Sequence, residues 1–220
     1  MMRITTAVSL LAVSMILASP ARADEESGLS IGLRAAYGLP LGSAGDNTDL
    51  ANLTAGAVPF QLDVGYRYGR NWQVGAYFGY GIAMVADEAK ATLAAQGATD
   101  IGGHTIMRAG LQHFYTFQPE ARFAPWVGCN AGYEWTRYAS ASSAGKDMEH
   151  GVRGFEGGIQ LGGDYKLTPK LTVGPFASFN LGQFQSQTMW VSGSGETATD
   201  VKDKAIHEWL QLGIKGTFNL

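Results

Sequence analysis

The chain has 220 residues, a formal net charge of −3 and a mean hydropathy of −0.04. This length suits one domain, and the charge provides no basic surface of the kind that binds nucleic acid, so we expect no nucleic-acid partner. Beyond the first residues no segment approaches 18 consecutive apolar residues, which excludes membrane-spanning helices.

The N-terminal segment has the pattern of a secretory signal peptide. Arg3 supplies a positive start, residues 8–18 form a mostly apolar stretch, and Ala21-Arg22-Ala23 offers a small-x-small cleavage site. We therefore predict a signal peptide over residues 1–23 and one domain over residues 24–220. Cleavage would remove Arg3 and Arg22 and no acidic residue, changing the net charge from −3 to −5.

Three very short turns alternate with four long polar loops along the rest of the chain. The turns fall at residues 70–71, 118–122 and 168–170, and the loops at residues 39–57, 85–103, 138–150 and 185–204. Segments of about ten residues with alternating hydrophobicity lie between them. This pattern predicts an all-β fold, an eight-stranded antiparallel up-and-down transmembrane β-barrel, with its turns on the periplasmic side and its loops outside the cell.

Successive side chains of a strand point to opposite faces, so parity sorts each predicted strand into two sets. One set is apolar and places aromatic residues near both strand ends, as in the interfacial girdles of membrane barrels. The predicted girdle residues are Tyr66, Tyr68, Trp72, Tyr115, Tyr133, Trp135, Tyr165 and Phe218. Alternation alone also fits a soluble lipocalin-like barrel with its apolar face inward, but the two aromatic bands favour a membrane.

The other parity carries charges that would face the lumen. They are Arg34, Asp63, Arg67, Arg108, Glu134, Glu156, Asp164, Lys166 and Lys215. Because eight strands leave room only for side chains, we interpret them as a structural network that closes the lumen. Bulky Tyr77, Trp126 and Phe176 on the same parity support a plugged barrel. A narrow pore or transporter for ions or small solutes is the alternative.

Two histidine patterns bear on possible chemistry. His104, His150 and His207 begin strands after three long loops and could form a rim site for a metal or a proton, but we favour solvated rim histidines. His113 and Glu208 share the outward parity at opposite barrel ends, and no serine neighbours His113. A lipid-modifying enzyme would need a nucleophile beside its base, so we predict no enzyme, no metal and no cofactor.

The loops are acidic, with ten aspartate or glutamate residues against four lysines. This composition would suit a surface-interaction role such as adhesion, or cation bridging to lipopolysaccharide, but we favour simple solvation of exposed loops as its explanation. Cys129 is the single cysteine, so no internal disulfide is expected.

Residues 210–220 have the look of the terminal β-signal of outer-membrane proteins. Together with residues 72–80 and 126–135, they resemble the OmpA-like family of small, eight-stranded outer-membrane barrel domains. The resemblance implies a Gram-negative cell envelope, contact with outer-membrane lipid and lipopolysaccharide, and insertion by the barrel-assembly machinery through the C-terminal strand. We also expect a monomer. The chain departs from the family by ending in Leu220 instead of an aromatic residue, with Phe218 on the same face. No peptidoglycan-binding domain follows the barrel, so no cell-wall tether is expected.

Overall fold

The structure, a computed structural model, describes residues 27–45, 48–95, 98–142, 147–192 and 195–220. The predicted signal peptide lies outside these residues. The elements, in chain order, are β1 (Gly28–Gly45), β2 (Thr48–Asp49), α2 (Leu50–Leu53), β3 (Thr54–Tyr68), β4 (Trp72–Val85), α3 (Asp87–Ala95), β5 (Ala98–Thr116), β6 (Phe123–Ser142), β7 (Asp147–Lys166), β8 (Leu171–Val191), β9 (Gly195–Asp200) and β10 (His207–Asn219).

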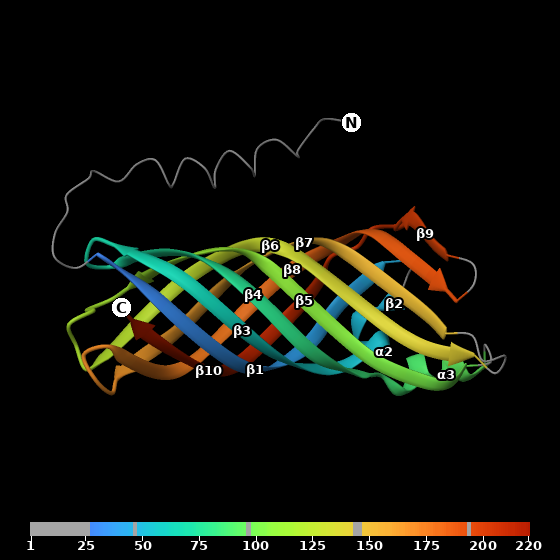
Figure 1. Ribbon diagram of the computed structural model, residues 1–220, viewed down its shortest axis with the longest axis horizontal. Coiled ribbons are helices and arrows are strands. Elements are labelled where there is room, and N and C mark those ends of the chain that lie inside the picture. The colour runs from blue at the N-terminus through green and yellow to red at the C-terminus, as the bar shows by residue number, and fades with distance from the viewer. Residues whose placement is uncertain (1–26, 46–47, 96–97, 143–146, 193–194) are drawn as a thin grey trace, which may run out of the picture.

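Eight long strands form a closed antiparallel ring, which confirms the predicted fold (Figure 1). Each pairs with its neighbour in the order β1, β3, β4, β5, β6, β7, β8 and β10, and β10 also pairs with β1. The short strand β9 pairs with β8 beyond the point where β10 begins, and β2 pairs with β1. In the described part of the chain, no ladder joins β9 to β1 or β2.

The two ends of the barrel differ. The end that we call the turn end holds the short connections after β3, β5 and β7, where turns were predicted, and also the start of β1 and the end of β10 (Figure 1, left). The other end, which we call the loop end, holds α2, α3, β2 and β9 (Figure 1, right). None of the helices in the described residues has the length and apolarity to span a bilayer.

The strands continue further into the predicted loops than expected. β5, β6, β7 and β8 have 19 to 21 residues, and β6 and β7 take up most of the loop predicted at residues 138–150. The prediction followed the alternation of apolar residues, which is needed only where one face meets an apolar environment. Backbone hydrogen bonding continues without it, and the strands therefore extend past the apolar band.

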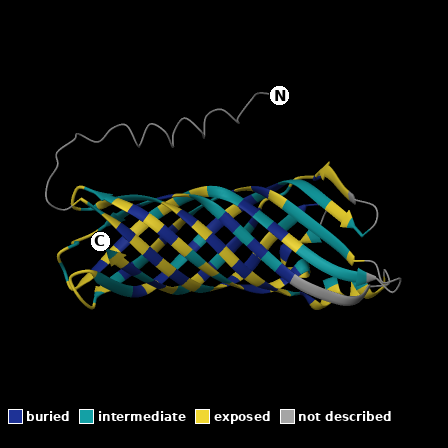
Figure 2. Ribbon diagram, viewed as in Figure 1, coloured by how far each residue is buried: buried dark blue, intermediate teal, exposed yellow. Residues whose placement is uncertain are grey.

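Burial alternates along the strands as the predicted parity requires (Figure 2). The outward set is exposed and apolar, with Leu33 at 66 %, Phe155 at 67 % and Ile159 at 64 %. A water-soluble protein rarely exposes such a continuous apolar surface. The apolar face therefore points outward, in contrast to a lipocalin-like barrel.

The aromatic bands frame this exterior. Tyr115 contacts both Trp72 and Phe117 edge to face near the turn end. Tyr133 contacts both Trp135 and Phe155 in the same way nearer the loop end. The segments between these bands are the ones that we treat as membrane-spanning.

One close backbone approach and one pairing of charged residues depend on details of the sequence. A Cβ atom at Gly174 in β8 would collide with the carbonyl oxygen of Gly163 in β7, so only glycine fits there. At the closing seam, Arg34 of β1 lies directly opposite Lys215 of β10. The seam therefore places two cations side by side in the lumen, and they must be neutralised from elsewhere.

Candidate functional site

The lumen is filled by two apolar clusters with two charged layers between them, and the first cluster lies in the turn half of the barrel. Phe114, Trp126 and Phe176 form a buried cluster there. The Lys215 ammonium lies 4.4 Å from the Trp126 ring centroid and 3.2 Å from a carboxylate oxygen of Asp164. The Trp126 indole N–H donates to the other Asp164 oxygen at 2.9 Å. Asp164 thus neutralises the lysine and orients the ring that blocks the lumen.

The next layer is centred on Arg34. Its Nε donates to Asp63 at 2.6 Å, and its terminal nitrogens donate to Gln160 at 2.6 Å and to Gln112 at 3.3 Å. The partners come from β3, β7 and β5, so the guanidinium group connects opposite walls of the ring. The positive charge of Arg34 and its N–H donors on three nitrogens therefore all have partners within the barrel.

A second charged layer surrounds Arg108 of β5. Arg108 lies 2.8 Å from Glu134 and 3.3 Å from Glu156, and Tyr77 donates its hydroxyl to Glu156 at 2.9 Å. His207 lies 3.6 Å from the second oxygen of Glu134. Two carboxylates therefore share one arginine, with the imidazole beside them.

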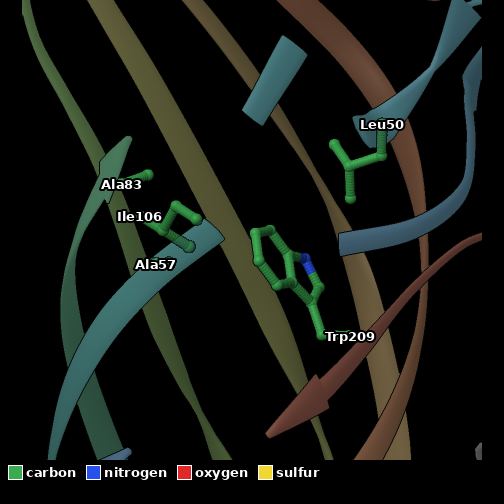
Figure 3. Close-up of a cluster of buried hydrophobic side chains, with 5 residues drawn as sticks. All are labelled: Leu50, Ala57, Ala83, Ile106 and Trp209. Atoms are coloured by element: carbon green, nitrogen blue, oxygen red, sulfur yellow. The ribbon is translucent and has the colours of Figure 1, made fainter. Parts of the chain in front are cut away.

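A second apolar cluster, shown in Figure 3, lies on the loop side of this layer. It consists of Leu50, Ala57, Ala83, Ile106 and Trp209. Leu50 belongs to α2, whereas the other four come from barrel strands, and the Trp209 ring also lies 5.2 Å from the Arg108 guanidinium carbon. The short helix thus contributes to the closure of the lumen.

Seven of the nine lumen charges named from parity belong to these two networks and to the Lys215–Asp164 pair. The other two, Arg67 and Lys166, line a cavity of about 180 Å³ at the turn end, where Arg67 donates to Asn219 at 3.3 Å. Between Arg34 and Glu156 the space is about 10 Å³, room for about one water molecule. A third cavity, of about 680 Å³, opens at the loop end.

The three histidines of the predicted rim site have different surroundings. His104 and His207 are each 1 % exposed, so the expectation of solvated rim histidines is wrong for these two. His104 stacks on Tyr138 and His207 stacks on Phe184, so each imidazole is packed below the mouth. His150 lines the loop-end cavity. Among the described residues, no group of three histidine, cysteine or acidic side chains is arranged to hold a metal ion.

On the outer surface, parity did not identify the partners of His113. The Tyr68 hydroxyl is hydrogen-bonded to His113 Nε2, and Trp72 stacks on the imidazole with ring centroids 5.0 Å apart. Strand register could have shown this contact, because Trp72 pairs with Tyr68 in β3 and Val74 pairs with His113 in β5. The three side chains lie in the turn-end aromatic band.

The loop-end cavity, which we call the chamber, is larger than the turn-end cavity lined by Arg67 and Lys166. Its walls include Val152 of β7 and Met189 of β8, and α3 contributes Leu93 to its side. Burial raises the pKa of Tyr138 to about 12 and lowers the pKa of His150, so both are neutral near pH 7. Glu149 also lines the chamber and pairs with Arg137 at 3.1 Å.

No protein-family model matches the chain, and no curated protein matches it. Solved structures do. Neisserial surface protein A is 15 % identical with a TM-score of 0.52, and the match covers 87 % of this chain and 98 % of that one. A major outer membrane protein from Thermus thermophilus is 11 % identical with a TM-score of 0.62, and the match covers 89 % of this chain and 100 % of that one. The outer membrane protein OprG from Pseudomonas aeruginosa is 14 % identical with a TM-score of 0.51, and the match covers 88 % of this chain and 97 % of that one. At these identities the likeness establishes the fold that the chain shares with these outer-membrane proteins.

Proposed function

We propose that this chain is an integral outer-membrane protein whose barrel is closed to solutes and which acts at the cell surface through its loop end. The observation that carries the proposal is the filled lumen. Two apolar clusters and two arginine-centred networks lie between the end cavities, and the space between Arg34 and Glu156 is about 10 Å³. Transport along the axis would require several layers to open together.

The exterior supports the placement in a membrane. Outward side chains such as Leu33, Ile159 and Phe155 are more than half exposed, and aromatic bands border them on both sides. Covering this surface with lipid removes the cost of exposing it to water, about 25 cal/mol for each Å². A bacterial outer membrane suits a barrel of this kind, with the turn end in the periplasm.

The remaining parts of the proposal concern partners. Cleavage after residue 23 would release the mature chain, and its C-terminal strand β10 would be the segment that the assembly machinery binds. Lipopolysaccharide would surround the outer surface of the barrel near the loop end, where Arg137 and Arg153 are exposed. We assign no catalytic role, because His113 is held between Tyr68 and Trp72 and Glu208 lies at the other end of the barrel.

Two measurements test this proposal. The protein from an outer-membrane fraction should migrate differently on a gel before and after boiling, as a detergent-resistant barrel does. Reconstituted in planar bilayers, it should give no discrete conductance steps. Steps of uniform size would instead support the narrow pore, and recovery of the protein in the soluble periplasm without a gel shift would refute the membrane placement.

A further inference from the structure

The chamber at the loop end has the size and form of a small-molecule site. Its volume of about 680 Å³ lies in the range of ligand pockets, about 300–1,000 Å³. Barrel strands form its walls, while α2 and α3 border it with Leu53 and Leu93. It is therefore a concave space enclosed by several elements and not a gap between two loops.

Much of its lining is apolar, although it lies beyond the aromatic band, where water would otherwise reach it. The apolar side chains include Leu53, Val85, Leu93, Met148, Val152 and Met189. Solvated loops need no such surface, and leaving it wet is unfavourable. A ligand with an apolar body would cover it.

Two aromatic rings at the chamber are held in place from behind. Tyr138 stacks on His104 with ring centroids 3.8 Å apart, and Phe184 stacks on His207 with centroids 4.1 Å apart. The Tyr138 hydroxyl is also 3.4 Å from the Thr54 hydroxyl. Rings fixed in this way are preorganised for a ligand, and their faces attract a cation.

The charge of the chamber is negative. Its described lining includes Glu88 and Glu149 and contains no lysine or arginine. Glu149 is paired with Arg137, whereas the Glu88 carboxylate has no basic partner among the described residues; the nearby Lys90 is paired with Asp87. The loops around the mouth carry ten acidic residues and four lysines in the sequence. This field attracts cations and repels anions.

From these features we propose that the chamber binds a hydrophobic organic cation, a molecule with an apolar, preferably aromatic, body and a single amine or quaternary ammonium group. The body would contact Leu93, Val152 and Met189, and the cationic group would lie near Glu88. The biological sense of this site rests on the proposed function, which places the chamber at the cell surface, but binding itself can be measured without that placement.

The test uses the full chain in nanodiscs of zwitterionic lipid and three probes that share one body: 4-phenylbutylamine, 4-phenylbutanol and 4-phenylbutyrate. Calorimetric titrations are corrected for partition into empty nanodiscs. The amine should bind most tightly, the alcohol less tightly, and the carboxylate at least tenfold more weakly than the amine. Equal affinity for all three probes, or no binding above that of empty nanodiscs, would overturn the proposal.

Variants locate the site. Val152→Trp should occupy the position proposed for the apolar body and weaken binding of the amine and the alcohol alike. Glu88→Gln should weaken the amine about two- to fivefold, as expected for an exposed charge, and leave the alcohol unchanged. Glu120→Gln at the turn end is the matched control and should change neither affinity. An amine affinity that Val152→Trp leaves unchanged would also refute the site. Conductance steps would count against the proposed function alone, because the chamber could still bind the amine in a conducting barrel.

Discussion

The Arg34–Asp63 pair offers the sharpest test of the closed lumen. Both side chains are buried, 3 % and 5 % exposed, and the joining distance is 2.6 Å. Removing one partner of such a pair leaves a buried charge and costs about 3–5 kcal/mol, at least about a hundredfold in the ratio of folded to unfolded protein. We therefore expect Arg34→Met and Asp63→Leu each to destabilise the barrel by this amount. Asp63→Leu should be the worse of the two, because it leaves Arg34 opposite Lys215.

The double variant separates this account from a purely steric one. Without either charge, the methionine can pack among Phe114, Trp126 and Phe176, whose rings already surround the guanidinium group at 5.3 to 5.9 Å. The double variant should cost no more than either single variant, a coupling of about 3 kcal/mol. Unfolding by urea from lipid vesicles, followed by tryptophan fluorescence and gel mobility, measures all four proteins. Additive costs would show that the two charges do not interact in the folded barrel.

Three further outcomes are expected. Gly174→Ala should destabilise the barrel by about 1–3 kcal/mol in the same assay, because the methyl group meets the Gly163 carbonyl, whereas Gly216→Ala, with nothing nearer than 3.9 Å, should be neutral. Trp126→Ala should cost about 3–5 kcal/mol but give no conductance in planar bilayers, because the arginine layers remain; steady steps would mean that one ring closes the lumen. Burial lowers the pKa of His150 below the ordinary 6.5, so the unfolded chain binds a proton there more readily than the folded protein does. The folded state should therefore lose stability as the pH falls through and below 6.5. An NMR titration midpoint above 6.5 would contradict this.

The exterior and the inward charges follow from the sequence because a strand has a period of two. Once the short turns define the strands, parity puts Arg34 and Glu134 on one face and Phe155 on the other, and the two aromatic bands indicate that the face with Phe155 points outward. Parity does not give the pairing between distant strands, so the contacts of Lys215 with Asp164, 51 residues away, needed the closed ring.

The loop end was harder to predict, because no bilayer imposes a pattern there. The helix α3 lies in a region interpreted as a polar loop, although Asp87 and Glu88 in its first turn are favourable to a helix N-terminus. The chamber depends on side chains from segments far apart in sequence, such as Leu53 and Met189, and no local signal joins them. The burial of His104 and His207 was missed because the strands continue past the apolar band. This extension places both residues below the mouth of the barrel.

The cation pair at the seam bears on how the ring assembles. Bringing β1 and β10 together sets Arg34 against Lys215, and like charges directly opposite each other on neighbouring strands are repulsive. Asp63 reaches Arg34 from β3, while Asp164 reaches Lys215 from β7. The repulsion between Arg34 and Lys215 is thus relieved only after β3 and β7, which carry these carboxylates, have taken their positions. Pairing of β1 with β10 before β3 and β7 are in place would therefore be unfavourable. These four side chains favour closure of the ring as the last step of assembly.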